Sequence, residues 1–231
     1  MDMKRRGFFQ KATAAGVGLL ALARGIKALA KGLPSDPDAT PAKAGADVIA
    51  LPRFEKNGAV PLEQALLKRK SSRDYAEQAL SRDQLSRLLW AANGVNRSDG
   101  HRTTPSAIAA YPVDLLVALP EGVYRYETKA HQLVKVLGQD IRDSIPIQGS
   151  FKKAAMIALY VINKNKVPGG NLAWGDLEIG CMGQNLFLEA AALGLGACIF
   201  GLVRYDKVSE LLKLRKDQIL RVAQAAGPLK D

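Results

Sequence analysis

The order of helix-like and strand-like segments constrains the fold of this 231-residue chain more than any other feature of its sequence. Helical patterns occur at 61–67, 81–93, 176–193 and 208–214. Short apolar runs typical of buried strands occur at 113–119, 123–126, 197–201 and 219–226, and a run at 154–162 fits either a strand or a helix. The regular strand–helix alternation of a parallel sheet is absent, so the sequence predicts an α+β fold.

Two of the predicted helices carry their own end signals. Ser81 and Gln84 form a capping-box pattern, and the leucines that follow recur at helical spacing. Gly94 and Gly194 stand where the second and third helices are expected to end, because glycine readily adopts the backbone conformation of a helix C-cap.

The first thirty residues have the composition of a targeting segment. Arg5 and Arg6 precede two phenylalanines, an apolar stretch spans 12–23, and Ala28-Leu29-Ala30 provides the small residues that a signal peptidase recognises. This order resembles a bacterial twin-arginine export signal, although Lys4 stands where such signals commonly have Ser or Thr. It predicts an exported, periplasmic protein that meets the membrane only through this signal. The alternative is an amphipathic helix with a chance arginine pair.

Residues 31–60 contain four prolines without a clear period and are predicted to be a linker or extended arm before a domain at 61–231. The net charge of +11 is uneven, since residues 1–30 carry six cations and one anion. The charge therefore does not by itself indicate a nucleic-acid partner. With 48% hydrophobic and 24% charged residues the chain is not intrinsically disordered, and it lacks an apolar stretch of about 18 residues that would predict a membrane span.

Several kinds of active site find no support in the residues present. The chain has two histidines and two cysteines without metal-ligand spacing, so no metal site is predicted. The nucleophile elbow of hydrolases, the phosphate loop of nucleotide hydrolases and the dinucleotide-binding glycine pattern are all missing. Cys181 and Cys198 are predicted to be buried free thiols; a disulfide between them is the alternative for an exported protein.

Residues 67–75, which we call the basic segment, follow directly on the first predicted helix. In an extended segment, the side chains of Arg69, Ser71 and Arg73 would project to one side, because they alternate along the chain. Two guanidinium groups and a hydroxyl on one side are suited to binding a phosphate. The alternative is a solvated basic helix end, which the helix dipole also favours.

Two further segments have small residues that would let a flat ligand come close. Residues 102–112 combine two prolines with small side chains, and Ser106 could donate a hydrogen bond there. Residues 194–201 contain three glycines, at which backbone can approach a ligand. Alternatively, the first segment is an ordinary surface loop and the second packs in the core.

Taken together, these motifs resemble those of the nitroreductase-like flavin enzymes, and within them the branch of the thiazole- and oxazole-forming dehydrogenases. The resemblance covers about 61–229 and rests on the following motifs: Arg69-x-Ser71-x-Arg73-x-Tyr75, Leu88–Gly94, Arg102-x-x-Pro105-Ser106-Ala107 through Tyr111-Pro112, Gln184-Asn185 through Gly196, and Ala226-Gly227-Pro228.

The resemblance implies a central, mostly antiparallel sheet flanked by helices, in an intertwined homodimer with FMN at the subunit interface. It assigns the FMN phosphate and ribityl chain to Arg69, Lys70, Ser71 and Arg73. It places three residues beside the flavin of the partner subunit: Pro105, Ser106 and Ala107. Gln184 would contact the ribityl chain or the ring edge, and a last group would line the ring near N5: Cys198, Ile199, Phe200 and Gly201.

Two positions depart from the pattern of that branch. Ile108 stands where the branch commonly has glycine, and would narrow the space above the flavin. Many relatives also continue beyond the position of Lys230 with a further basic segment, for which Lys230 could substitute.

The expected function is that of an FMN-dependent oxidoreductase, in which small-molecule donor and acceptor use one pocket in turn and the flavin carries the hydride. The electron donor stays open, because an exported enzyme would not meet the cytoplasmic NAD(P)H pool. Two alternatives remain: a non-catalytic flavin- or ligand-binding module on the same fold, and a basic exported adaptor that binds anionic polymers.

Overall fold

The computed structural model describes residues 47–54 and 60–230. The predicted export signal and most of the predicted arm lie outside the described residues. Among the residues described, no helix is long and apolar enough to cross a membrane.

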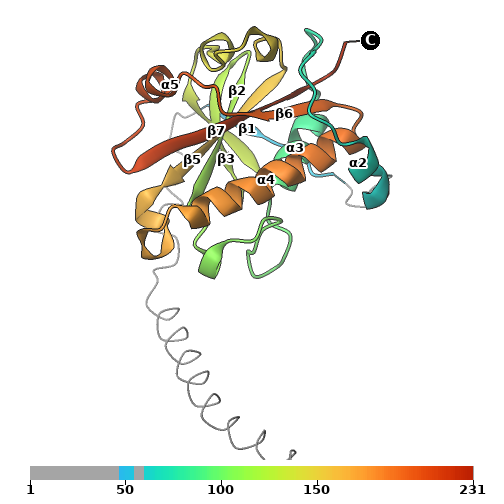
Figure 1. Cartoon of the computed structure of the whole chain (residues 1–231). Coiled ribbons are helices and arrows are strands. Elements are labelled where there is room, and N and C mark those ends of the chain that lie inside the picture. Colours follow the sequence, from blue (N-terminus) through green and yellow to red (C-terminus); the bar gives the residue numbers. More distant parts are fainter. Residues whose placement is uncertain (1–46, 55–59, 231) are drawn as a thin grey trace, which may run out of the picture. The chain divides into compact units, whose positions relative to one another are not determined.

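A seven-stranded sheet forms the centre of the described domain, with the spatial order β1-β4-β3-β2-β5-β7-β6 (Figure 1). Its strands are β1 (Val48–Ala50), β2 (Val113–Leu119), β3 (Gly122–Glu127), β4 (Gln132–Leu137), β5 (Met156–Asn163), β6 (Gly196–Phe200) and β7 (Gln218–Gly227). Every pairing between these strands is antiparallel. The predicted α+β class and the mostly antiparallel sheet are confirmed.

Helices and short turns cover the two faces of the sheet. The helices of the described domain are α2 (Leu62–Lys68), α3 (Arg82–Asn93), α4 (Ala173–Ala192) and α5 (Tyr205–Leu211). One core contains the buried side chains of α3 and α4, and the second contains those of α5 and of the 141–154 segment. The strand β5 contributes alternate side chains to both cores, for example Tyr160 to the first and Leu159 to the second.

Burial on both faces explains why the apolar run at 154–162 could not be assigned from sequence. All eight residues of β5 are buried, so the two-residue alternation of a half-exposed strand is absent. In contrast, Ser81 caps α3 as predicted: its hydroxyl accepts from the Gln84 amide at 3.1 Å, and the Gln84 side chain accepts from the Ser81 amide at 2.9 Å.

Three elements differ from the sequence prediction. The strand β4 was not predicted, and the edge strand β1 lies within the segment expected to be a linker or arm. The helix α5 covers Tyr205–Leu211 rather than 208–214, because Lys213 adopts a left-handed conformation that ends the helical turn.

A chain of hydrogen bonds fastens the β1 segment to the domain. The hydroxyl of Ser86 donates to the Pro52 carbonyl at 2.7 Å and lies 2.7 Å from Nε2 of His131. On the other side of the ring, Nδ1 of His131 lies 2.8 Å from the hydroxyl of Tyr126. Leu51 is buried in the core beside this chain. Residues 48–54 are therefore part of the domain.

Candidate active site

The basic segment lies alongside β6 at the edge of the sheet. Ser71 forms a parallel bridge with Ala197, and the amide of Ser72 donates to the Ala197 carbonyl at 2.9 Å. Burial raises the pKa of the Cys198 thiol, whereas the Arg73 cation and the Ser71 hydroxyl beside it act in the opposite direction. The structure thus brings Ser71 and Arg73 together with the strand that sequence reasoning assigned to the flavin ring.

The other residues of the basic segment turn toward α4. Lys70 and the buried Ser72 line a hollow of about 160 Å³ together with Phe187 and other residues of α4, β6 and the chain end. The guanidinium carbon of Arg69 lies 5.3 Å from the centre of the Phe187 ring. Lys70 is therefore not on the same side of the segment as Ser71 and Arg73, although the resemblance assigned all of them to the FMN phosphate and ribityl chain. Arg69, which the alternation placed with Ser71 and Arg73, also lies toward α4.

The end of the described chain runs beside the same segment. The amide of Lys230 donates to the Asp74 carbonyl at 3.1 Å, and its ammonium lies 3.2 Å from the Asp74 carboxylate. Tyr75 is buried beneath, and its hydroxyl donates to the Ser72 carbonyl at 2.8 Å. Lys230 is thus close to the basic segment, as the sequence suggested, but its charge is already paired with Asp74.

Only part of β6 and of the residue that follows it could contact a ligand. Cys198 and Phe200 point into the core, where the Phe200 ring stacks on Phe151 with centroids 4.2 Å apart. Ile199 faces α4 at Gly183, where an added Cβ would lie 2.5 Å from the Ile199 side chain. Gly201 follows the strand, and a Cβ there would meet nothing within 4 Å. Open space next to this backbone is what a flat ligand would need.

The segment from Arg102 to Pro112 forms a loop held by polar contacts. The Arg102 guanidinium lies 4.1 Å from the centre of the Tyr111 ring, and the amide of Tyr111 donates to the Ser106 hydroxyl at 2.9 Å. Thr104 accepts from the side-chain amide of Asn185 at 3.2 Å, which ties the loop to α4. We call residues 102–112 the Ser106 loop.

Strain is concentrated in the Ser106 loop. Ile108, Ala109 and Tyr111 all have positive φ, at 49°, 56° and 45°. A positive φ is unusual for any residue with a side chain and most unfavourable for a β-branched one. Ile108 occupies the place at which the sequence comparison expected glycine, and its side chain is exposed. Strained backbone of this kind is typical of functional sites.

Replacing Ile108 with glycine is expected to stabilise the protein. The change removes about 1–2 kcal/mol of left-handed strain, offset by the larger entropy of glycine in the unfolded chain, for a net gain of about 0.5–1 kcal/mol. Urea unfolding of Ile108→Gly and of wild type measures it. The matched control is Ala107→Gly, which has no positive φ to relieve and should lose stability. A less stable Ile108→Gly protein would contradict this reading of the loop.

The two groups of predicted site residues lie on opposite sides of α4. Asn185 faces the Ser106 loop, whereas Phe187 faces Arg69. Two residues along a helix correspond to about 200° around its axis. In Figure 1 the green Ser106 loop lies below α4, and the teal basic segment lies above it near β6. A single chain therefore does not bring Pro105, Ser106 and Ala107 together with the basic segment.

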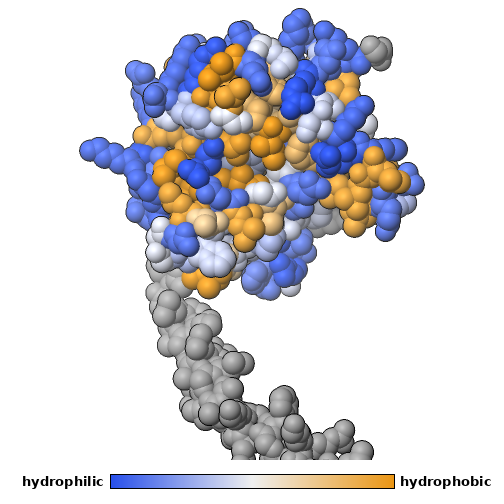
Figure 2. All heavy atoms as spheres, viewed as in Figure 1, coloured by the Kyte–Doolittle hydropathy of each residue, from blue (hydrophilic) through white to orange (hydrophobic). Residues whose placement is uncertain are grey.

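Exposed apolar side chains occupy part of the surface of α4 and α2, as Figure 2 shows. Trp174 and Leu177 on α4 and Leu62, Leu66 and Leu67 on α2 are all exposed. Gln184 is also exposed, on the same helix α4. Apolar residues grouped at a surface are typical of an interaction site.

Glu178 is a residue of this region that sequence reasoning missed. Its side chain is 2% exposed, and neither carboxylate oxygen has a hydrogen-bond partner among the described residues. Burial raises its pKa to about 7, although Ser106, Arg102 and the Val113 amide act in the opposite direction. Helical spacing offered a signal, because Glu178 precedes the buried Met182 and Leu186 at intervals of four residues.

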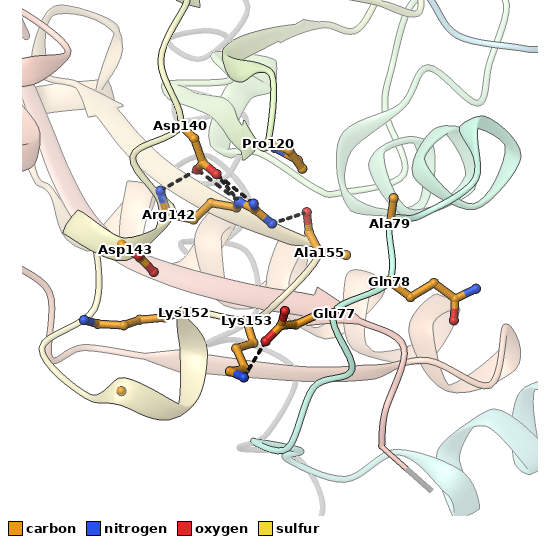
Figure 3. Close-up of a pocket in the computed structure, with 11 residues that line it drawn as sticks. Glu77, Gln78, Ala79, Pro120, Asp140, Arg142, Asp143, Lys152, Lys153 and Ala155 are labelled. Carbon is orange, nitrogen blue, oxygen red and sulfur yellow. Dashed lines mark hydrogen bonds and ion pairs between the residues drawn. The ribbon is translucent and has the colours of Figure 1, made fainter.

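A separate cavity of about 610 Å³ lies elsewhere on the domain, between the 77–79 segment, Pro120 and residues 140–155 (Figure 3). Its acidic and basic side chains are equal in number. The Arg142 guanidinium is held by both Asp140 oxygens and donates to the Ala154 carbonyl at 2.9 Å. None of the predicted site residues lines this cavity, and Arg142 connects two parts of its wall.

Both cysteines are free thiols, as the first of the two alternatives predicted; Cys198 is buried and Cys181 is half-buried. Within 47–54 and 60–230, no group of three or more His, Cys, Asp or Glu side chains is arranged to hold a metal ion.

Comparisons with known proteins identify a family and several relatives of this chain. Residues 66–227 match the nitroreductase family. The "Putative nitroreductase MJ1384" of Methanocaldococcus jannaschii is 31% identical over 74% of this chain and 92% of its own length. A crystal structure of a "putative nitroreductase" from Ralstonia eutropha JMP134 is 34% identical, with a TM-score of 0.75 over 80% of this chain and 90% of that one.

A more distant structure shares the fold. It is a "putative nitroreductase in complex with fmn" from Desulfovibrio desulfuricans, 23% identical, with a TM-score of 0.56 over 74% of this chain and 88% of that one. The match over most of the sequence, together with the antiparallel sheet and the placement of the basic segment at its edge, shows that this chain belongs to the nitroreductase family.

Proposed function

We propose that the protein is an FMN-dependent oxidoreductase that transfers hydride between two small molecules. One observation carries the proposal: two arginines without a carboxylate partner flank Ser71 on a segment that runs along β6. Among the described residues, neither Arg69 nor Arg73 forms an ion pair, in contrast to the neighbouring Asp74 and Lys230. Unpaired guanidinium groups beside a hydroxyl suit a phosphate dianion.

The described residues fit FMN at this edge of the sheet. Arg73 and Ser71 would hold the phosphate, with Arg69 approaching from the α4 side. The backbone of Ile199–Gly201, where Gly201 leaves open space, would lie against the ring. FMN supplies the hydride chemistry when bound, and the protein supplies position and electrostatics. That the Desulfovibrio desulfuricans relative is described in complex with FMN supports the same cofactor here.

The arrangement around α4 supports a homodimer as part of this proposal. The exposed Trp174, Leu177 and Gln184 occupy the arc of the helix surface between the side of the Ser106 loop and the side of Phe187. A second copy packed on this arc would cover apolar surface. It would also bring its own Ser106 loop toward the basic segment of the first. We therefore propose that Pro105, Ser106 and Ala107 serve the FMN site of the partner subunit.

We propose the localisation and the substrate class from the sequence alone. The twin-arginine pattern at 1–30 favours export, and the motifs at 69–75 and 102–112 favour the branch of the thiazole- and oxazole-forming dehydrogenases. Nitroaromatics, quinones or a dehydrogenated small molecule are compatible acceptors, and the donor stays open between NAD(P)H and an extracytoplasmic reductant.

A second candidate is a non-catalytic flavin-binding module on the same fold. It is favoured by one observation, the exposed and strained Ile108 at a position where the branch has glycine, because this side chain would narrow the approach to the ring. Turnover separates the two: reduction of a nitro compound or quinone with a matched donor would exclude the module.

The first test is the absorption spectrum of the purified domain. The chain from Lys31 onward, produced in the cytoplasm, is expected to show oxidised-flavin bands and to release FMN on denaturation. Added riboflavin, which lacks the phosphate, is the matched control and should bind much more weakly. A colourless protein that also fails to take up FMN would refute both the enzyme and the flavin-binding module.

A further inference from the structure

The chain immediately after β6 is paired with a segment that lies far from it in the sequence. Pro146 and Val203 form an antiparallel bridge. The amide of Ile147 donates to the Leu202 carbonyl at 2.9 Å, so the next two residues are also opposite each other. Residues 146–147 and 202–203 are therefore held side by side where β6 ends.

This pairing separates the four side chains into a buried and an exposed pair. Residues directly opposite each other across antiparallel chains project to the same side, and neighbours along one chain project to opposite sides. Pro146 and Val203 are buried, whereas Ile147 is 54% and Leu202 is 53% exposed. Two aliphatic side chains thus stand next to each other at the surface. We call Ile147 and Leu202 the apolar pair.

Contacts beneath the apolar pair fix its position. The Phe151 ring stacks on the Phe200 ring with centroids 4.2 Å apart, which joins the two segments in the core. The Gly201 carbonyl accepts from the Val203 amide at 3.0 Å and from the Tyr205 hydroxyl at 2.9 Å, which holds the turn after β6. Because both segments are fastened to the core, the apolar pair keeps its place relative to β6.

The apolar pair lies at one end of the site proposed for FMN. Ser71 pairs with Ala197, and Gly201 follows four residues later, about 13 Å along an extended strand at about 3.3 Å per residue. FMN held by its phosphate at Ser71 is long enough to bring its ring to Gly201, where an added Cβ would meet nothing within 4 Å. Leu202 is the next residue, so the apolar pair would border the ring. The inference therefore rests on the proposed function.

The size and the place of the apolar pair favour a small molecule over a second subunit. A stable interface buries roughly 800 Å² on each partner, far more than two half-exposed side chains supply. The pair also stands on the segment that covers the second core, whereas α4, on which the homodimer is proposed, covers the first. The surface next to Gly201 is thus suited to the part of a substrate that extends beyond the ring.

We propose that Ile147 and Leu202 are specificity-determining residues that contact the apolar part of the substrate beside the flavin ring. Neither side chain carries a charge or a hydrogen-bonding group, so covering them is favourable only where the substrate is apolar too. The protein should therefore select uncharged, planar redox molecules with an alkyl or aryl group, such as an alkylated quinone, over charged molecules of similar reactivity.

The first test measures binding rather than turnover. Menadione, an uncharged methylnaphthoquinone, is titrated into the FMN-loaded protein while methyl NMR signals of isoleucine, leucine and valine are followed. The signals of Ile147 and Leu202 should shift until they saturate. Those of Val136, which is exposed on β4 near the opposite edge of the sheet, should stay in place. Naphthoquinone sulfonate, a charged counterpart, should bind about tenfold more weakly.

The double substitution Ile147→Thr with Leu202→Asn tests the same residues by making the pair polar. Menadione should bind about tenfold more weakly, with unchanged affinity for the sulfonate and unchanged flavin content. Ile147→Val with Leu202→Met keeps the surface apolar and should bind menadione as wild type does. Val136→Thr is the matched control, because it replaces an exposed apolar residue elsewhere. In turnover, KM for menadione should rise with kcat unchanged, which a general loss of structure would not produce.

The possible outcomes separate this assignment from the proposed function. A protein that holds no FMN would refute the proposed function and, with it, the role of the apolar pair. With FMN bound, signals of Ile147 and Leu202 that do not shift on adding menadione would overturn the assignment alone. So would a polar variant that binds menadione as tightly as wild type. A polar variant whose dimer dissociates in light scattering would place the pair in a subunit contact and overturn the assignment as well.

Discussion

The double substitution Arg69→Ala with Arg73→Ala is expected to leave the protein folded and free of FMN. Hydrogen bonds to a charged group contribute about 1.5–3 kcal/mol each, so loss of two should weaken FMN binding by about 10²–10⁴-fold. Arg73 is exposed and the Arg69 guanidinium lies over the Phe187 ring, so the fold should tolerate both changes. The flavin-to-protein ratio after purification and titration with FMN measure the effect.

A matched control separates phosphate binding from general charge. Lys207→Ala with Lys216→Ala removes the same number of cations from exposed positions in and after α5, away from the basic segment. Its flavin content should equal that of wild type. Lys70→Ala is a finer test, because Lys70 lines the hollow on the α4 side and should matter less than Arg73. Unchanged flavin in the double arginine variant would remove the phosphate role.

The elements that were predicted well are those whose pattern is local. Ser81 and Gln84 cap α3 through their own side chains and amides, and no distant residue takes part. The long helix α4 begins three residues before its predicted start but otherwise agrees, because twenty consecutive residues leave few alternatives.

The two strands that were missed, β1 and β4, carry little pattern of their own. The strand β4 lies between β1 and β3, and only Leu133 and Val134 of its six residues are buried, so its sequence lacks the alternation of a half-exposed strand. The same holds for β1, three residues in a proline-containing stretch that gain their hydrogen bonds from β4. Pairing across such a distance leaves no period in either segment.

The site shows the same division between local and distant information. The alternation of Arg69, Ser71 and Arg73 was readable from the sequence, and the structure places Ser71 and Arg73 beside Cys198. The same alternation puts Lys70 on the opposite side, as observed, but it could not show that Arg69 would lie against Phe187 of α4. Helical spacing could indicate that Glu178 is buried, but not that its carboxylate would lack a hydrogen-bond partner among the described residues.

Mixing two defective variants should restore FMN binding if the site is shared between subunits. In one variant, Arg69→Ala with Arg73→Ala, the basic segment is lost; in the other, Ala107→Trp, an indole fills the space beside the flavin. Neither homodimer should bind FMN. Each mixed dimer, however, contains one site with an intact basic segment and an intact partner loop, and one site with neither. If subunits exchange at random, about a quarter of all sites should recover FMN.

This experiment distinguishes a site shared between subunits from a site within one chain, because α4 separates the Ser106 loop from the basic segment. Within one chain the Ser106 loop and the basic segment lie about 200° apart around the helix, on the Asn185 and Phe187 sides. If one chain supplied both, mixing would restore nothing. Co-expression with two affinity tags isolates the mixed dimer, for which half-occupancy by FMN is expected. The tagged mixture of wild type and Ala107→Trp is the control and should also hold one FMN per dimer, whereas an empty mixed dimer of the two defective variants would show that the site does not cross the subunit boundary.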